Sequence, residues 1–344
     1  MMRYSRALPP DFEKLFLQDE PQDNPLRFIV DLVKSDSHAT DKPLDLQLRE
    51  DRGAGGKVTL YRGGTAILNM QFDRQAYELN LSAHKKYQEQ FPRLGMKKSY
   101  DIEDSEGLRA GIASYLNSIR VEPHHLQEGG CENWLSHRYG RHWQKDEWVA
   151  VDREVVIGYE NQAEKEAEWE EPIKKRFDEF GVELLALMQS RFNLPVQKKT
   201  VGNELDCLLW HPPTRDLFIT EVKAGTDAAG VYLSPIQVAA YLAAWRRFVE
   251  AQPEDALKGV HSLLAQKQRL GLIPKEVPLP EMINALRPAI IVQNPNRESG
   301  CWKTLDGILQ LLQEAMPGCL DGLRLWAVEN DALTEITDTW REWA

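Results

Sequence analysis

The chain has 344 residues, of which 42% are hydrophobic, and carries a formal net charge of −11. A chain of this length and composition can bury a large core and more typically forms two domains than one. The net charge disfavours a protein that coats nucleic acid non-specifically, because such binding depends on neutralising phosphates with lysine and arginine.

The sequence favours a soluble cytoplasmic protein with no membrane partner. No stretch approaches the ~18 consecutive apolar residues that a membrane span requires. The first residues, MMRYSRALPPDFEKLF, lack the apolar core of a secretory signal. The cysteines form no C-x-x-C pair, which disfavours a zinc ribbon or an iron–sulfur cluster and suits buried thiols in a reducing compartment. They are Cys131, Cys207, Cys301 and Cys319.

The N-terminal half reads as a sheet accompanied by helices. Residues 1–35 contain short helix-periodic pieces, and residues 44–82 alternate apolar and polar side chains between glycine turns, which predicts an antiparallel β-meander. Residues 83–120 are helical in pattern, with an acidic start before LRAGIASYLNSIR. We expect a domain over residues 1–155 that serves recognition or assembly, through a homo-oligomer or partner proteins.

Residues 124–148 combine metal-binding, basic and aromatic side chains, and two interpretations stay open for each group. The spacing of the first group fits no known zinc module, so these side chains are either a metal site or ordinary histidines and a thiol: His124, His125, Cys131, His137 and His142. The second group either contacts nucleic acid by stacking and charge or forms the aromatic stripe of a helix: Trp134, Arg138, Tyr139, Arg141, Trp143, Lys145 and Trp148.

A change of pattern follows residue 155. Residues 149–159 predict one more strand, and the glutamate-rich stretch that follows makes 156–171 an acidic, exposed connector. A helix restarting at Pro172 is expected over residues 172–192, followed by a strand at 195–200.

Two strand-like runs, LDCLLW and DLFITEV, are joined by the turn His211–Asp216 and predict a β-hairpin with a wide loop. The first strand carries Asp206. The second carries Glu221 and Lys223, which lie two residues apart and therefore point to the same face. An acid and an amine thus emerge together beside a second acid.

A helix is predicted after this hairpin, over residues 234–251. Ser234 resembles an N-cap and Pro235 a first helical residue, which would place Gln237 and Tyr241 one turn apart on one helix face. We expect these two side chains to converge with those of the hairpin on one cleft.

The remaining chain completes an α/β pattern. Residues 253–285 are largely helical, LRPAIIVQNP predicts a buried strand, TLDGILQLLQEAM an amphipathic helix and LRLWAVEN a last strand. Residues 172–330 therefore read α-β-β-β-α-(α)-β-α-β, a mixed sheet flanked by helices. The second domain is placed at residues 172–344.

Two carboxylates on adjacent strands can hold Mg²⁺ or Mn²⁺ through oxygen ligands, and a water on such an ion can act as a nucleophile. A lysine beside them can orient that water and offset negative charge in the transition state. The pattern of Asp206, Glu221 and Lys223 therefore favours metal-assisted phosphodiester hydrolysis.

This pattern resembles the PD-(D/E)xK nuclease superfamily, which has the restriction-endonuclease-like fold. Asp206 matches the first acid of the motif, and Glu221-Val222-Lys223 matches its second half. The segment from Gln237 to Tyr241 is similar to the Q-x-x-x-Y helix of the RecB-like branch. Leu205 stands where the motif has proline, a departure that is common in the superfamily.

The resemblance implies a role for each matching residue. Asp206 and Glu221 would bind Mg²⁺ or Mn²⁺, and Lys223 would act on the water. Gln237 and Tyr241 would support the site or contact DNA. The helix that opens this fold often adds an acid, for which Glu183 and Glu179 are the candidates, with Glu183 as the candidate further metal ligand. A solvated surface charge is the alternative role for either glutamate.

We therefore expect a metal-dependent nuclease acting on DNA, in defence against foreign DNA or in repair. One alternative is an RNA nuclease or toxin, because fold alone does not fix the substrate. Another is a catalytically silent nucleic-acid-binding or scaffold protein on the same fold. A third interpretation makes Glu221 and Lys223 an ion pair on a solvated hairpin, with Gln237 and Tyr241 covering a core edge.

Overall fold

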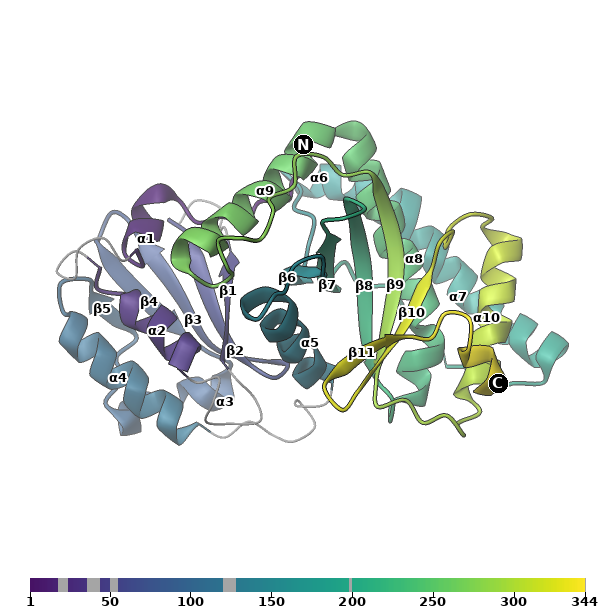
Figure 1. The fold of residues 1–344 in the computed structure, drawn as a ribbon, viewed down its shortest axis with the longest axis horizontal. Coiled ribbons are helices and arrows are strands. Elements are labelled where there is room, and N and C mark those ends of the chain that lie inside the picture. Colours follow the sequence, from purple (N-terminus) through teal and green to yellow (C-terminus); the bar gives the residue numbers. More distant parts are fainter. Residues whose placement is uncertain (18–23, 36–43, 50–54, 120–127, 198–199, 344) are drawn as a thin grey trace. The chain divides into compact units, whose positions relative to one another are not determined.

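The structure is a computed structural model that describes residues 1–17, 24–35, 44–49, 55–119, 128–197 and 200–343. These residues form two compact units, each with its own sheet (Figure 1). Unit 1 comprises Met1–Tyr4, Asp146–Val260 and Pro280–Ala344. Unit 2 comprises Ser5–Lys145 and His261–Leu279.

Unit 2 is built on a five-stranded antiparallel sheet in the order β1-β2-β3-β4-β5. Its strands are β1 (Leu44–Arg49), β2 (Lys57–Arg62), β3 (Thr65–Asp73), β4 (Glu78–Ser82) and β5 (Ser99–Asp101). The meander predicted over residues 44–82 is confirmed. Gly63 allows the tight β2–β3 turn because its φ of 61° lies in the left-handed region that favours glycine.

Short helices accompany this sheet. They are α1 (Pro10–Lys14), α2 (Arg27–Ser35), α3 (Lys85–Gln88), α4 (Ser105–Ser118) and α5 (Glu128–Ser136), which continues as a π-helical turn over His137–Arg141. The acidic start predicted for α4 is confirmed, because the Asp104 side chain accepts a hydrogen bond from Gly107 N at 3.1 Å. β5 interrupts the stretch 83–120, which the sequence pattern predicted as helical throughout.

Unit 1 is built on a six-stranded mixed sheet in the order β11-β10-β9-β8-β7-β6. Its strands are β6 (Val149–Val155), β7 (Leu205–His211), β8 (Asp216–Ala224), β9 (Ala285–Gln293), β10 (Arg324–Glu329) and β11 (Ala332–Glu335). β8, β9 and β10 run parallel, and the other pairs are antiparallel. The predicted α/β class with a mixed sheet is confirmed at this level.

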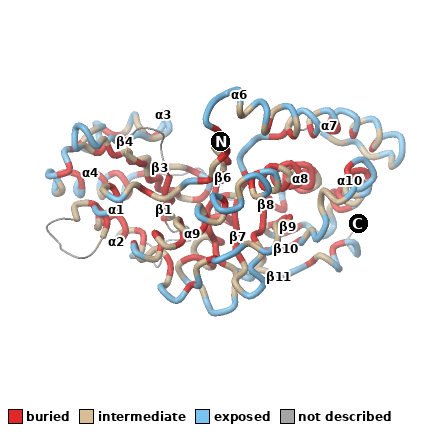
Figure 2. The backbone as a smooth tube through the Cα atoms, turned by 90° about the horizontal axis from the view of Figure 1, so that it is seen from above, coloured by how far each residue is buried: buried red, intermediate tan, exposed pale blue. Residues whose placement is uncertain are grey.

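The helices of unit 1 include α8, which lies on this sheet. They are α6 (Gln162–Lys165), α7 (Lys175–Leu187), α8 (Ala228–Ala251), α10 (Cys301–Ala315) and α9 (Pro253–Leu270), whose residues from His261 onward belong to unit 2. α8 packs directly on β8 and β9, and α7 and α10 pack on α8. Figure 2 shows α8 buried over most of its length, as expected for a helix that is apolar nearly all round.

The strand predicted at residues 195–200 is wrong for the part that the structure describes. Residues 195–197 and Thr200 have no regular structure, and residues 198–199 lie outside the described chain. Gln197 N donates to the Tyr232 hydroxyl at 3.3 Å and Val201 N to Asp178 Oδ1 at 2.8 Å, so side chains take the donors that a strand partner would use. β6 pairs with β7 instead.

Two predicted helix starts are also wrong. Residues 162–192 form one helical run, so no helix starts at Pro172. Pro172 lies inside the π-helical segment Glu166–Lys174, where the α-helical hydrogen bonding is altered, as expected because proline has no backbone N–H to donate. α8 begins at Ala228, capped by Asp227, which accepts from Gly230 N at 2.9 Å. Ser234 is therefore no N-cap.

Pro235 lies inside α8 and lacks the N–H that an α-helix directs to the residue four positions earlier, Val231. The Ser234 hydroxyl donates to Val231 O at 2.7 Å. This bond satisfies the carbonyl that Pro235 leaves without its usual donor, which explains how the helix continues through proline.

The bounds of the units differ from the predicted division at residues 156–171. β6 belongs to unit 1, and residues 261–279 belong to unit 2. Within the segment predicted as an acidic connector, residues 162–171 are helical and bury Trp169. The division into domains at residues 1–155 and 172–344 stays a prediction.

Candidate active site

The β7–β8 hairpin brings Asp206 and Glu221 together. Cys207 pairs with Thr220 in this antiparallel ladder, so Asp206 and Glu221 are cross-strand neighbours on one face of the sheet. Lys223 follows Glu221 by two residues on β8 and shares that face. The hairpin closes with Arg215 in the left-handed region, at φ 59°, and Arg215 N donates to His211 O at 2.8 Å.

The three side chains form one ion-paired group. Lys223 Nζ lies 2.8 Å from Glu221 Oε1 and 3.3 Å from Asp206 Oδ2. It also donates to Val222 O at 2.7 Å, while Val222 N donates to Asp206 Oδ2 at 2.8 Å. The two carboxylates, the lysine amine and the backbone N–H and C=O of Val222 therefore belong to one network.

This network is buried. The side chains of Glu221 and Lys223 are 1% and 7% exposed, and that of Asp206 is 19% exposed. Burying these charges costs desolvation free energy, which opposes folding. The attraction between the ammonium and the carboxylates offsets this cost. The burial of the network contradicts the interpretation of an ion pair on a solvated hairpin. The convergence of these residues with Gln237 and Tyr241 on one cleft stays a prediction.

α8 adds two buried polar side chains, Gln237 and Tyr241. Burial raises the pKa of the Tyr241 hydroxyl, and the negative charges of Glu221 and Asp206 raise it further, against a weaker opposing interaction with Gln237. Tyr241 is therefore held protonated near the acids. Gln237 Oε1 is buried and has no hydrogen-bond partner among the described residues.

Gly230 in the first turns of α8 makes room for the lysine. A Cβ at this position would lie 2.9 Å from Lys223 Cδ and 2.2 Å from Asp227 Oδ2, the capping carboxylate. Only glycine leaves both groups where they are. Sequence reasoning missed Gly230 and Asp227, although aspartate is a preferred residue at a helix N-cap.

α7 carries the two glutamates that are candidates for a further metal ligand, and that role stays a prediction. Glu183 and Glu179 are exposed on α7. Asp178 instead binds the chain that leads into β7, through the hydrogen bond from Val201 N, and pairs with Lys174. Sequence reasoning missed Asp178, because helical periodicity does not show which acid faces a loop.

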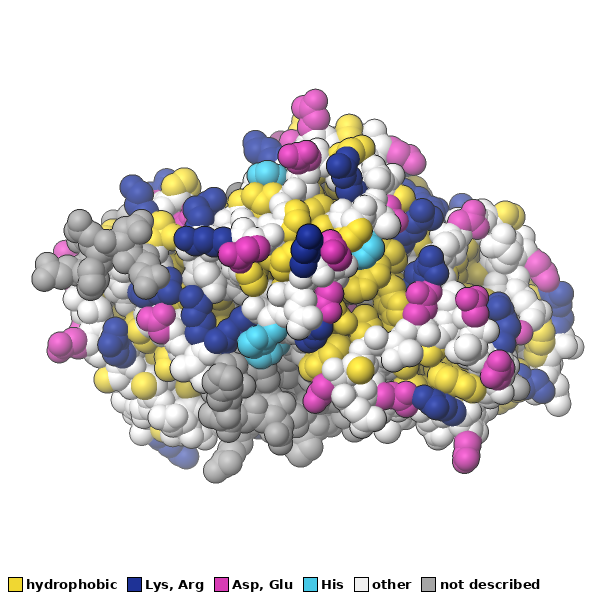
Figure 3. Space-filling view, in the orientation of Figure 1, with side chains coloured by type: hydrophobic (Ala, Val, Ile, Leu, Met, Phe, Trp, Pro, Cys, Tyr) yellow, Lys and Arg dark blue, Asp and Glu magenta, His cyan; other side chains and the backbone are white. Residues whose placement is uncertain are grey.

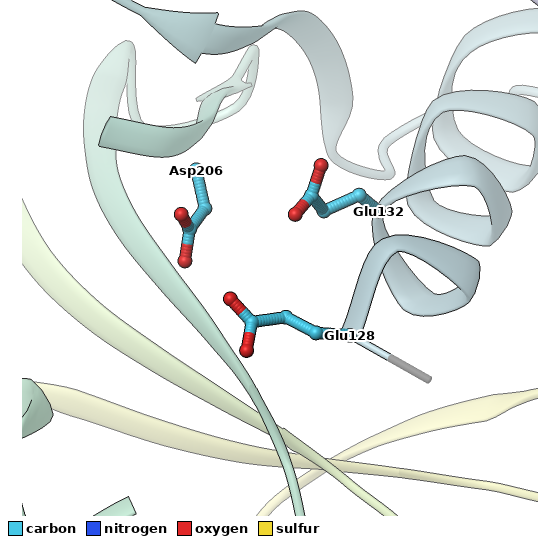
Figure 4. Close-up of side chains that lie close together, drawn as sticks. All are labelled: Glu128, Glu132 and Asp206. Atoms are coloured by element: carbon cyan, nitrogen blue, oxygen red, sulfur yellow. The ribbon is translucent and has the colours of Figure 1, made fainter. Parts of the chain in front are cut away.

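Further acids lie on α5 of unit 2. Figure 4 draws Glu128 and Glu132, which share one face of α5, and Asp206 of β7 in unit 1. Glu132 is buried and Glu128 half-buried. Sequence reasoning did not single out these two glutamates, although their spacing of one helical turn is a signal of a shared face.

Aromatic and histidine side chains of residues 128–148 make ring contacts within each unit. His124 and His125 lie outside the described residues. In unit 2 the rings of His137 and His142 are 4.4 Å apart, and Arg138 lies over the Tyr139 ring at 5.1 Å. In unit 1 Trp148 contacts the rings of His211, Phe218 and Trp326. Cys131, Cys207 and Cys301 are buried thiols, and Cys319 is half-buried.

Two further observations concern the charge on the surface and the hydropathy of the helices. Acidic and basic side chains are interspersed on the face drawn in Figure 3. In the described part of the chain, no helix combines the length and apolar character needed to cross a membrane.

The donor set of the network fits a hard divalent cation. Mg²⁺, Mn²⁺ and Ca²⁺ prefer oxygen ligands from carboxylates, amides and carbonyls. Asp206 and Glu221 offer carboxylates on adjacent strands, and the buried Gln237 Oε1 is an acceptor without a hydrogen bond in the described structure. These residues are suited to hold such an ion.

Comparison of the sequence with models of known protein families and with curated proteins finds no match, and comparison of the fold with solved structures finds none either. The geometry of the Asp206, Glu221 and Lys223 network is therefore the basis on which a function is assigned.

Proposed function

We propose that the chain is a divalent-metal-dependent nuclease that hydrolyses phosphodiester bonds of DNA, with a restriction-endonuclease-like core in unit 1. The observation that carries this proposal is the buried network in which Lys223 lies within 3.3 Å of both Asp206 and Glu221. Its resemblance to the PD-(D/E)xK motif supports the same reaction. Unit 2 would serve recognition or assembly, in defence or in repair.

Asp206 and Glu221 would hold Mg²⁺ or Mn²⁺, and the buried Gln237 Oε1 on α8 would be a further neutral oxygen donor. The bound ion supplies Lewis-acid charge and a more acidic water as the nucleophile. Lys223 would orient that water and offset the charge that develops on the phosphorane. Tyr241, which burial keeps protonated, would donate a hydrogen bond and help to position the substrate.

The test is incubation of the purified chain with circular and linear DNA, with and without Mg²⁺ or Mn²⁺, beside Glu221→Gln. We expect metal-dependent cleavage that Glu221→Gln removes. Cleavage that persists in Glu221→Gln or in a chelator would contradict the site. A matched ribo-substrate separates DNA from RNA hydrolysis, because only RNA carries the 2′-hydroxyl.

A catalytically silent nucleic-acid-binding or scaffold protein on the same fold is the second candidate. The observation that favours it is the close pairing of Lys223 with both acids, which a purely structural ion pair would also show. DNA binding without cleavage in Mg²⁺, Mn²⁺ or Ca²⁺ would support this candidate over the nuclease.

A further inference from the structure

Within unit 1, three oxygen atoms lie close to the ammonium of Lys223. Its Nζ donates hydrogen bonds to Val222 O at 2.7 Å and to Asp206 Oδ2 at 3.3 Å, and it forms an ion pair with Glu221 Oε1 at 2.8 Å. A lysine ammonium has three N–H donors, so at least two of them are committed to this group. In this arrangement Lys223 is held by the acids rather than directed at a water or a phosphate.

The same oxygens are of the types that a divalent cation selects. Carboxylates and a peptide carbonyl are hard donors, which Mg²⁺ and Mn²⁺ bind in preference to nitrogen or sulfur. The ammonium therefore stands at the point to which these donors would direct a divalent ion. An ammonium and a divalent cation cannot both occupy that position.

We propose that Lys223 is an internal counter-cation, whose ammonium holds Asp206 and Glu221 together in the metal-free protein and must be displaced when a divalent ion binds. Displacement would free its N–H groups to face the attacking water. The inference rests on the proposed function in one respect, namely that these acids bind metal. It adds a control on that site: the protein's own lysine competes with the ion.

Charge and packing both favour such an exchange. At equal distance a divalent ion attracts each carboxylate twice as strongly as an ammonium does. The lysine stem is a flexible chain that can turn its amine to a new position. Gly230, which has no Cβ to press on Lys223 Cδ, leaves the stem the room that an alanine would take.

If Lys223 competes with the ion for the two acids, removing its positive charge should raise the affinity for metal. Without the positive charge at residue 223, the acids should bind a divalent ion about tenfold more tightly or better, since each 1.4 kcal/mol of lost competition is tenfold in affinity. The metal-free protein should melt roughly 5–10 °C lower, because two buried carboxylates lose their partner.

The experiment compares the full chain with Lys223→Met and Lys223→Gln by thermal melting and by titration calorimetry with Mg²⁺ and Mn²⁺. Methionine removes the charge at similar length, and glutamine keeps a neutral donor so that the fold is retained if methionine prevents folding. Lys267→Met is the matched control, because Lys267 is a buried lysine of unit 2, 4% exposed, whose Nζ donates to Gln47 Oε1 at 3.2 Å.

We expect both Lys223 variants to bind metal more tightly than the wild type and to gain more melting temperature from it, while Lys267→Met binds metal as the wild type does. Equal or weaker binding by the Lys223 variants overturns the inference and leaves the proposed function intact. A gain in affinity in Lys267→Met as large as in the Lys223 variants also overturns it, because the effect would then be general. No binding by any of the proteins overturns the inference and the proposed metal site together.

Discussion

Each unit buries a lysine within a polar network, and the two networks contain partners of different charge. In unit 1 Lys223 pairs directly with two carboxylates, at 2.8 and 3.3 Å. In unit 2 Lys267 of α9 donates to Gln47 Oε1 at 3.2 Å, and the amide nitrogen of Gln47 donates to the Asp45 carboxylate at 2.8 and 2.9 Å. A neutral amide is thus one partner of the lysine in unit 2 and also binds the acid.

On the proposed function, the difference would separate a metal site from a structural anchor. The Gln47 network also includes Ser136, at 3.2 Å from Gln47 Nε2, so it links β1, α5 and α9 through hydrogen bonds. Two carboxylates that share one ammonium attract additional positive charge. The comparison teaches that a buried lysine indicates function through the charges around it, and that burial alone does not distinguish the two cases.

The largest expected effect tests this separation directly. Asp206→Asn and Glu221→Gln should each lower cleavage on the order of 10²–10³-fold or more, because each removes a charged group that acts in the transition state. Lys267→Met should change cleavage only a few-fold once its folding is verified by circular dichroism. Rates of DNA cleavage in Mg²⁺ check all three variants, and a loss in Lys267→Met equal to that in Glu221→Gln would break the comparison.

Much of this architecture is visible in the sequence, because alternation and strand spacing are local properties. The alternating residues 44–82 form the predicted meander, and the two-residue spacing of Glu221 and Lys223 places both beside Asp206. Cross-strand neighbours follow from the hairpin register, which a short turn fixes. The convergence of these three side chains was therefore within reach of the sequence.

Other features depend on contacts between distant residues, which periodicity does not encode. The chain before β7 is held by Asp178 rather than by a neighbouring strand, through one hydrogen bond from Val201 N. α8 starts ahead of the predicted Ser234 because Asp227 caps it and the Ser234 hydroxyl satisfies Val231 O. Glu221 is likewise buried, and burial depends on tertiary packing, which local sequence does not reveal.

A second test sharpens the comparison at two helical glycines. Gly230→Ala in unit 1 should cost about 1–3 kcal/mol in the free energy of unfolding and should reduce cleavage, because its Cβ would press on Asp227 and on the stem of Lys223. Gly130→Ala in α5 of unit 2 meets nothing within 4 Å and should stabilise the helix by up to about 1 kcal/mol. Denaturant unfolding and cleavage assays measure both. Unchanged activity in Gly230→Ala would show that the stem of Lys223 tolerates displacement.

A third, smaller effect concerns buried tyrosines. Tyr241→Phe, and likewise Gln237→Ala, should reduce cleavage about tenfold, since positioning contacts contribute less than the primary charges. Tyr115→Phe is the matched change in unit 2, where the hydroxyl donates to Ile67 O and burial raises its pKa as it does for Tyr241. Tyr115→Phe should lower the free energy of unfolding and leave cleavage unchanged. If Tyr241→Phe lowers stability without affecting turnover, Tyr241 is a core residue like Tyr115.

The smallest expected effect is a loss of stability at acidic pH that arises from protonation of His211 in unit 1. Burial lowers the pKa of His211 below its usual 6.5, against the opposing charges of Asp216 and Asp146. The fold therefore favours the neutral ring, which stacks near Trp148 with ring centroids 4.3 Å apart and shares a hydrogen bond with Thr214 Oγ1 at 2.9 Å. A group with a lowered pKa of this kind contributes stability that is complete above pH 6.5 and is lost as the pH falls toward the folded-state value.

His211→Gln keeps a polar side chain at this position but cannot gain a charge, so it should lose less melting temperature than the wild type between pH 7.5 and pH 5. The expected difference is about 1–2 °C, because the side chain is only half-buried and a fraction of 1 kcal/mol moves the midpoint by that amount. Melting curves of both proteins across this pH range measure it. Parallel curves would mean that the acid response arises at other groups, and His211 would then add nothing to the contrast between the units.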